Sequence, residues 1–485
     1  MNDVRSLNRG LGLLPAIAVN VGNMIGTGIF LKARVMTCNV GSASTVIVLW
    51  VVGGLLVLAG AFAYSEIAAL MPEAGGEYVY VKRAYGRFAS FLCGWTLFVL
   101  QKCGSQAALA VGFAIFMNVA TGGALEQRGI SFNLYGHHGS LTLLTVVAVA
   151  SIWIIALINA RSVARGGETA FGLTSIKVGF LLCLALAVLL FGHGTTAHFT
   201  QSNQGGLCEG VAGSARYGLA GLGAATLGAL WAYDGWSNVA PLMGELRDPS
   251  RNAPRVFIGG MLVVGTLYVL VTVSYFYVLS PTEIANIPLS SSVGTEVLHR
   301  FLGPAAVTTL ACVLMLSAFS SQQASSLAGA RIPFAMARDG LFFHRFGELS
   351  PSTRSPVNAI LWQAGFATVF ALSGTFDALT DAAMIGAWLF YGLAASTVFV
   401  FRRTAAEVPR PYRCLGYPIL PALFLLLAAA VIVNAFVATP RTALTAAAVM
   451  LLGLPFYAYW SRTSQLRASA PDQPAMVGSL DVRQK

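Results

Sequence analysis

Two glycine-rich stretches interrupt apolar segments of this 485-residue chain, and both contain residue types suited to binding a small polar molecule. The first covers residues 22–30 and has a glycine on each side of Thr27. The second covers residues 231–238 and contains Asp234. Glycine adopts backbone conformations that other residues resist, and it lets a ligand approach the main chain closely. A helix broken inside a membrane exposes N–H and C=O groups that lipid cannot satisfy, so such breaks survive where they line a cavity or hold a ligand.

The first stretch could bind both ends of an amino acid. If the helix unwinds there, a second half-helix begins near Thr27 and Gly28 with free N–H groups and a positive dipole end, which suit a carboxylate. The preceding half-helix ends near Met24 and Ile25 with free carbonyls, which suit an ammonium group. A small-residue face packed against another helix explains the same spacing equally well. A nucleotide-binding loop is disfavoured because no strand precedes these glycines.

The second stretch is chemically richer. Asp234 lies inside an apolar segment, and ionisable residues within membrane spans are candidates for function. The alternative is that its carboxylate pairs with backbone N–H groups freed by the break. Trp231 and Trp236 flank Asp234. A large aromatic side chain beside an unwound segment can close over a bound substrate, although ordinary packing would also explain both tryptophans.

Two lysines also lie in apolar segments. Lys177 has long apolar stretches on both sides, which disfavours a side chain that extends to the membrane surface. A buried lysine must be paired or neutral, so Lys177 could be a fixed cation in the bundle or a proton carrier. Lys102 has the polar neighbours Gln101, Ser105 and Gln106, and the four residues suggest a polar seam.

Composition predicts the helices that must position these residues. The chain is 56% hydrophobic and 10% charged, whereas soluble domains have about 25% charged residues. This excludes a set of soluble domains and indicates one integral membrane domain. Twelve apolar runs have the length of a span, at residues 12–31, 44–70, 89–120, 141–160, 169–192, 214–243, 255–279, 303–330, 357–374, 378–401, 417–438 and 442–461. We keep the first run as a span because no cleavage pattern of a signal peptide follows it.

The basic residues predict the orientation. With these spans, 22 of the 30 Lys and Arg residues fall on one side and 6 on the other. This bias places a tail of residues 1–11 and a tail of residues 462–485 in the cytoplasm, so we expect a multi-pass protein of a bacterial inner (plasma) membrane. The net charge of +11 thus reflects topology and does not indicate nucleic-acid binding, because the charges lie in separate short loops.

Cysteine and histidine usage argues against several classes of function. No Cys/His spacing is typical of a metal site, and no nucleophile–base pair is apparent in the spans, so we expect no metal, no cofactor and no enzyme activity. A membrane sensor that binds an amino acid would need an added soluble domain, and the tails are too short for one. Cys38 and Cys208 both fall on the outer side. They could pair in principle, but no sequence rule brings them together, so we expect them to be free.

Several motifs together resemble the amino acid–polyamine–organocation (APC) superfamily, most closely its L-type amino acid transporter branch and bacterial relatives of that branch. They occur in family order over residues of about 10 to 440 and comprise Gly22–Phe30, Tyr64–Glu66 leading to Met71–Tyr78, Trp231–Asn238, Gly244–Arg255 and Ala337–Gly340. The resemblance implies an all-helical membrane protein with twelve transmembrane helices and a LeuT-like fold. Its transport core would be residues 12–401, with two inverted five-helix repeats at about 12–192 and 214–401. Two appended helices would follow at 417–461.

The same resemblance implies roles for individual residues. The substrate carboxylate would bind N–H groups at Thr27 and Gly28, and its amino group would bind carbonyls at both breaks, near Met24, Ile25 and Trp231. The implied substrate site comprises Met24, Ile25, Gly26, Thr27, Gly28, Trp231, Ala232, Tyr233 and Gly235, and Trp231 is its outer gate. The ammonium of Lys177 would take the place of a coupling sodium ion, with Ser317, Ser320 and Ser321 nearby in the eighth span.

One departure concerns a partner. The L-type transporters of animals are linked to a heavy subunit through a cysteine between spans 3 and 4, but residues 121–140 contain no cysteine here. We therefore expect no disulfide-linked heavy subunit. The sequence predicts a sodium-independent amino acid transporter that works by alternating access, with exchange and proton coupling both open. The preferred amino acid and the oligomeric state are not readable, and a polyamine carrier of the same superfamily is the alternative.

Overall fold

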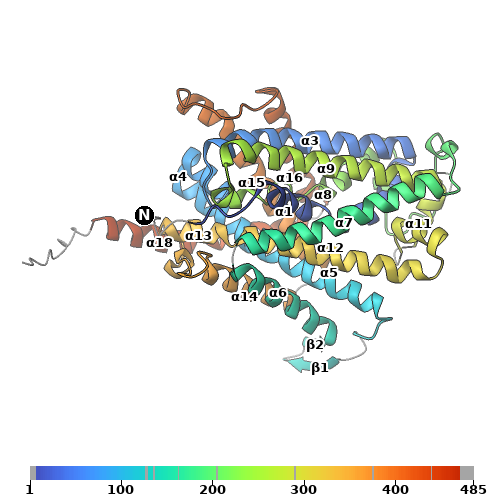
Figure 1. Cartoon of the computed structure of the whole chain (residues 1–485), viewed down its shortest axis with the longest axis horizontal. Helices are drawn as coiled ribbons and strands as arrows, with labels where there is room; N and C mark the ends of the chain where they lie inside the picture. The colour runs from blue at the N-terminus through green and yellow to red at the C-terminus, as the bar shows by residue number, and fades with distance from the viewer. Residues whose placement is uncertain are drawn as a thin grey trace, which may run out of the picture.

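The computed structural model describes residues 7–125, 129–134, 137–161, 163–203, 206–288, 291–373, 376–438 and 440–469. Long helices run roughly parallel to one another and form a single bundle (Figure 1). The last helix, α18, lies at one end of the bundle, and a small hairpin, β1–β2, lies below the bundle in this view (Figure 1).

The secondary structure is mainly helical in the described part of the chain. The α-helices are α1 Leu13–Met24, α2 Gly28–Val40, α3 Ala43–Leu70, α4 Glu77–Thr96, α5 Gly104–Ala120, α6 Leu143–Arg161, α7 Val163–Phe191, α8 Gly218–Ala232, α9 Pro249–Val278, α10 Pro281–Ala285, α11 Val293–Leu302, α12 Ala305–Gly329, α13 Arg331–Arg338, α14 Val357–Ser373, α15 Phe376–Thr404, α16 Ile419–Ala438, α17 Pro440–Leu451 and α18 Gly453–Ser469. Shorter turns of helix are η1 Leu97–Cys103, η2 Thr196–Phe199, η3 Gly213–Ala215, η4 Ala240–Glu245 and η5 His344–Gly347.

Nine helices in the described residues are long and apolar enough to cross a membrane, or ten if α1 and α2 form one broken span. The sequence predicts twelve spans, and the difference lies in helices that are shorter than the apolar runs. The run at 214–243 holds only the 15 residues of α8, because the helix stops at the second glycine-rich stretch. The run at 357–374 forms α14, which is also a short apolar helix.

Both predicted breaks are present. Helix α1 ends at Met24 and α2 begins at Gly28, with a bend of 41° between them. Helix α8 ends at Ala232, and the chain forms only turns and the 3-10 helix η4 before α9 begins at Pro249. Gly235 lies between α8 and η4 with a φ of +98°, a conformation that L-residues rarely adopt. The sequence signal of glycines inside apolar runs therefore located both interruptions.

The third span changes its hydrogen-bond pattern at its centre. Helix α4 passes into the π-helical turn η1, Leu97–Cys103, and then into α5 without leaving helical geometry. A π-turn inserts an extra residue and rotates the side chains that follow, and such turns are frequent at functional sites. Here the turn contains Gln101 and Lys102, both of which are buried.

The closest packing in the bundle involves two groups of helices, α3 with α9 and α12 with its neighbours. Helices α3 and α9 pack along their lengths and lie side by side at one edge of the bundle (Figure 1). Helix α12 packs against α5, α7 and α1 and is buried over most of its second half. That half contains a run of serines and glutamines from Ser320 to Ser326, so the interior of the bundle is polar where α12 faces the break in the first span.

The all-helical expectation needs one small correction. Strands β1 Gly129–Leu134 and β2 His137–Thr142 pair as an antiparallel hairpin in the loop between α5 and α6. Gly129 is paired with Thr142, and Leu134 with His137. The hairpin is the one sheet in the described residues, and it leaves the helical architecture of the bundle unchanged.

The expectation that Cys38 and Cys208 are free is wrong. The two residues form a disulfide with a Cα–Cα distance of 5.6 Å. Cys38 lies near the end of α2, and Cys208 lies in the loop before α8. A pairing across 170 residues depends on how the two broken spans pack together, and no local sequence pattern encodes that.

Candidate substrate site

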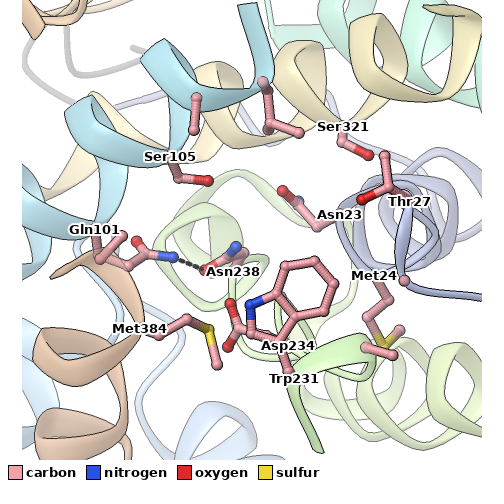
Figure 2. Close-up of a pocket in the computed structure, with 17 residues that line it drawn as sticks. Asn23, Met24, Thr27, Gln101, Ser105, Trp231, Asp234, Asn238, Ser321 and Met384 are labelled. Carbon is pink, nitrogen blue, oxygen red and sulfur yellow. Dashed lines mark hydrogen bonds between the residues drawn. The ribbon is translucent and has the colours of Figure 1, made fainter. Parts of the chain in front are cut away.

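The two breaks meet at a buried cavity of about 100 Å³ near the middle of the bundle. Figure 2 shows Asn23, Thr27 and Ser321 facing Gln101 and Ser105 across this cavity. The full lining comprises Asn23, Met24, Gly26, Thr27, Gly28, Gln101, Ser105, Ala108, Leu109, Trp231, Ala232, Asp234, Gly235, Asn238, Ser321, Ala383 and Met384. The first, third, sixth, eighth and tenth predicted spans therefore all contribute residues to one site.

The first break presents free donors to the cavity. Thr27 is the N-terminal cap of α2, and its carbonyl accepts from Phe30 N at 3.1 Å. Among the described residues, the N–H groups of Thr27 and Gly28 have no hydrogen-bond partner, whereas Gly26 N donates to Met24 O at 2.9 Å. Unpaired N–H groups at a helix N-terminus form a ready anion site. The geometry at Thr27 and Gly28 thus has the properties needed to hold a carboxylate.

Lys177 fills the other side of the same break. Its Nζ donates to Gly22 O and Ile25 O at 2.7 Å each and to Ser321 Oγ at 3.3 Å. Ser317 Oγ donates to Ile25 O at 2.9 Å. The ammonium and the hydroxyl therefore satisfy carbonyls that the end of α1 would otherwise leave unpaired, at the negative end of that helix dipole.

This arrangement changes the expected acceptors for an amino group. Ile25 faces Lys177 and does not line the cavity, so its carbonyl is not available there. Met24 O accepts from Tyr268 Oη at 2.8 Å. The same hydroxyl lies 3.1 Å from Ala232 O at the second break. Tyr268 on α9 thus bridges the two interruptions.

Asp234 supplies an acceptor on the cavity wall. Its Oδ1 is buried and has no hydrogen-bond partner among the described residues. The carboxylate lies beside the ring of Trp231 in Figure 2. An unpaired buried acceptor costs about 1–3 kcal/mol, which a bound ammonium group would recover. The same carboxylate also accepts hydrogen bonds from Gly235 N and Tyr391. It therefore pairs locally at the break, as one alternative expected, and keeps Oδ1 as a free acceptor for a ligand.

Two glycines allow the breaks to approach each other. A Cβ at Gly28 would lie 2.8 Å from Ala232 Cβ and 3.3 Å from the Trp231 ring. A Cβ at Gly235 would lie 3.0 Å from the backbone of Asn23. Any larger side chain at either position would push the first span away from the sixth.

Trp231 forms part of the cavity wall and contacts α2. The Nζ of Lys32 lies 4.4 Å from the centre of the Trp231 ring, in a cation–π arrangement. Such contacts contribute about 0.5–1 kcal/mol when exposed and more when desolvated. Lys32 therefore helps to fix the orientation of the aromatic ring that the sequence suggests as a gate.

A second polar cluster surrounds Asn238. Its Oδ1 accepts from Lys102 Nζ at 2.6 Å and from Gln101 Nε2 at 3.0 Å. Tyr391 Oη on α15 lies 3.4 Å from the same oxygen. Lys102 is fully enclosed and does not line the cavity, whereas Gln101 does. The π-helical turn η1 thus places Gln101 and Lys102 against Asn238 of the second break.

Besides Ile25, two more of the predicted site residues lie elsewhere. Tyr233 does not line the cavity; its ring packs on Trp50 and Tyr268, and its hydroxyl donates to Trp50 O at 3.0 Å. Ser320 pairs with Thr174 at 3.3 Å instead of contacting Lys177. Successive residues on a helix point in different directions, so Ser321 reaches the lysine and Ser320 does not.

Several lining residues were not identified from the sequence. Asn23 and Asn238 lie within the motifs, so their polar side chains inside apolar runs were a usable signal. Met384 also lines the cavity, whereas Tyr268 lies behind it and bridges the two breaks. No local feature distinguishes them from core residues, because their role depends on which helices pack around the breaks.

Hydrogen bonds and a salt bridge connect the segment before α1 with η4 and with the start of α13. Leu11 N donates to Glu245 O at 3.0 Å, and Arg247 N donates to Leu11 O at 2.9 Å. The fully buried Arg331 forms a salt bridge of 2.7 Å with Glu245. The chain before α1, the segment η4 and the start of α13 are therefore held together at this end.

Two interrupted spans that meet at a polar cavity are characteristic of the substrate site of a secondary membrane transporter. The family model described as amino acid permease matches residues 11–457. The chain therefore belongs to the amino acid permease family of the APC superfamily, and it is an amino acid transporter and not an enzyme.

Individual relatives cover almost the whole chain. It is 28% identical over 455 residues to the serine/threonine exchanger SteT of Bacillus subtilis (strain 168), covering 93% of this chain and 96% of that protein. It is 26% identical over 454 residues to the human b(0,+)-type amino acid transporter 1, covering 93% and 88%. It is also 26% identical over 459 residues to the human large neutral amino acids transporter small subunit 2, covering 94% and 81%.

Proposed function

We propose that this permease is a sodium-independent exchanger of small amino acids that works by alternating access around the cavity between the two breaks. The observation that supports this most is that the first break has free N–H donors on one side and a lysine ammonium on the other. Free N–H groups of Thr27 and Gly28 face the cavity, and the ammonium of Lys177 holds the carbonyls behind them. A substrate carboxylate would bind the first set, and its amino group would bind near Asp234.

The preference for small substrates follows from the size of the cavity. Ligand pockets for drug-sized molecules occupy about 300–1,000 Å³, whereas this cavity has about 100 Å³. Leu109, Trp231 and Met384 limit its extent with bulky side chains. The relative SteT is a serine/threonine exchanger, which agrees with small substrates and with exchange. Proton coupling is the alternative mode.

The proposed architecture is the LeuT-like arrangement of twelve spans. In it, residues 12–192 and 214–401 form two inverted repeats. The two appended spans are α16, and α17 together with α18. Helix α8 with η4 would be the broken sixth span, and α14 the ninth. We also propose that both termini lie in the cytoplasm, since 22 of the 30 basic residues fall on that side.

We expect that the protein needs no disulfide-linked heavy subunit. Residues 121–140 contain no cysteine, and the outer-side residues Cys38 and Cys208 are bonded to each other. Purification of the full chain from its membrane and reconstitution alone should therefore give active liposomes. Dependence of activity on a second, disulfide-linked chain would contradict this part of the proposal.

The substrate must have both an α-amino and an α-carboxylate group. Decarboxylated amines are expected to compete with labelled serine at least about tenfold less well than the parent amino acids, because donors at Thr27 and Gly28 would stay unpaired in a closed site. The measurement is counterflow in proteoliposomes with a panel of amino acids and their amines. Equal competition by putrescine would assign the protein to the polyamine carriers instead.

Exchange should proceed at the same rate when choline replaces sodium. The reason is that the Lys177 ammonium already contacts Gly22 O and Ile25 O, so a cation already occupies this end of the first break. Counterflow of labelled serine in matched sodium and choline buffers tests this, with and without a pH gradient. A steep requirement for sodium is the result that would overturn it.

A further inference from the structure

A groove outside the substrate site runs along the face where α3 packs against α9. One part of it is basic and lies at the N-terminal end of α9, lined by Ser250, Arg251, Pro254, Arg255, Ile258, Gly259, Leu262, Pro411 and Tyr412. The adjoining part is apolar and is lined by Val51, Gly54, Leu55, Leu58, Tyr233, Met261, Leu262, Gly265, Thr266, Val269, Leu270 and Val273. Leu262 lines both parts, so the two hollows adjoin on α9. We refer to them together as the groove, with a charged end and an apolar part.

The charged end is suited to an anionic group. Arg251 and Arg255 are one helical turn apart and exposed, so both side chains leave the same face of α9. No acidic side chain lines this part of the groove, and neither arginine forms a salt bridge within the described residues. Two guanidinium groups in fork geometry match a phosphate well.

The opposite wall of the charged end is held in place from within the protein. Pro411 and Tyr412 belong to the loop between α15 and α16. On either side of them, Arg410 Nε donates to Glu66 Oε1 at 3.0 Å and Cys414 N donates to Glu66 Oε2 at 2.6 Å. Glu66 is itself buried. The wall is therefore an ordered part of the bundle.

The apolar part of the groove is long enough to reach from the membrane surface to the centre of the bilayer. Ten residues separate Arg255 from Gly265, which is about 15 Å along a helix. This is half of the hydrocarbon thickness of about 30 Å. A headgroup at Arg255 would thus place its acyl chain along α9 with the chain end near Gly265, which matches one leaflet of the bilayer.

The groove has Tyr233 at its base. Gly54 and Gly265 lie on either side of the Tyr233 hydroxyl: a Cβ at Gly54 would lie 2.9 Å from Tyr233 Oη, and a Cβ at Gly265 would lie 3.8 Å from it. Tyr233 is the first residue after α8, and it packs on Tyr268, which bridges the two breaks. An occupant of the groove would therefore contact the back of the substrate site.

We propose that this groove binds an anionic phospholipid, with the phosphate on Arg251 and Arg255 and an acyl chain on the α3–α9 face against Tyr233. The bound lipid stabilises Tyr233 against Trp50 and so supports the conformation in which the two breaks meet. The binding itself is independent of which amino acid is transported.

The test measures lipid retention directly. Purified full-length protein is incubated with mixed micelles that contain phosphatidylglycerol or phosphatidylcholine, and bound lipid is counted by native mass spectrometry. We expect wild-type protein to retain phosphatidylglycerol in preference to phosphatidylcholine. Changing both Arg251→Gln and Arg255→Gln should weaken this binding about 30-fold, since each basic residue near an anionic surface contributes about a factor of five.

Two further variants distinguish specific lipid binding in the groove from general attraction of anionic lipid to the basic protein surface. Arg161→Gln with Arg345→Gln removes two exposed arginines outside the groove and should leave retention unchanged. Gly265→Leu fills the apolar part of the groove without a backbone clash and should reduce retention while both arginines remain. Equal losses in the two arginine pairs, or full retention in Gly265→Leu, would overturn the proposal. Unchanged elution in size exclusion shows that each variant is folded.

Discussion

Replacing Lys177 with alanine is expected to reduce serine counterflow by about 100-fold, with the protein still present in the membrane. The change removes the cation that lies 2.7 Å from both Gly22 O and Ile25 O. Each buried carbonyl left unpaired costs about 1–3 kcal/mol, and 1.4 kcal/mol corresponds to a factor of ten. The break would then relax toward a continuous or displaced helix, and the donors at Thr27 and Gly28 would lose their position.

The control for this variant is Ser320→Ala. Ser320 lies on the same helix as Ser321 but pairs with Thr174 and does not contact the lysine. It should transport close to the wild-type rate. Rates are divided by the amount of protein in each liposome preparation, so a loss of expression is not counted as a loss of transport. Wild-type counterflow in the alanine variant would mean that Lys177 is not required at the break.

Trp231→Ala should release bound substrate at least about tenfold faster than wild-type protein. The partly buried indole covers one wall of the cavity and is held by Lys32 at 4.4 Å. A tenfold change corresponds to about 1.4 kcal/mol, which is less than the full burial of a large apolar side chain contributes. Water would then enter and weaken the polar contacts beneath. Dissociation of labelled serine from detergent-purified protein is the measurement.

Two control variants show whether faster substrate release from Trp231→Ala is due to loss of the aromatic cover. Trp231→Phe keeps an aromatic cover and is expected to retain most of the occlusion. Trp362→Ala removes an exposed tryptophan far along the chain and should have no effect on dissociation. If Trp231→Ala held serine as long as wild-type protein, the residue would be part of the packing and not a gate.

The sequence predicted the parts of the site whose signal is local. Glycines around Thr27 and beside Asp234 located the two breaks, and the isolated charge of Lys177 marked a residue that must find partners inside the bundle. The family resemblance supplied the expectation that the Lys177 ammonium takes the place of a coupling sodium ion near the eighth span. Apolar runs predicted most helices because a span needs a minimum length of apolar residues, which composition reports directly.

The remainder depends on long-range packing. Ile25 and Tyr233 belong to the motifs, yet both turn away from the cavity, because a broken helix points its side chains in directions that helical periodicity does not predict. The bridge by Tyr268 joins positions that are 244 and 36 residues away from it. Ser320 and Ser321 are neighbours with different partners, and only the rotation of α12 decides between them.

The Cys38–Cys208 bond has a mechanical consequence. It ties the far end of α2 to the loop that leads into α8, so the half-helices on that side of both breaks are joined by a covalent link. Any rocking motion must then carry these two half-helices together, while α1 and η4 remain free to separate from them. The bond also has a redox consequence, since disulfides persist in oxidising compartments and not in the cytosol. It therefore supports the proposal that this end of the bundle faces away from the reducing interior of the cell, independently of the distribution of basic residues.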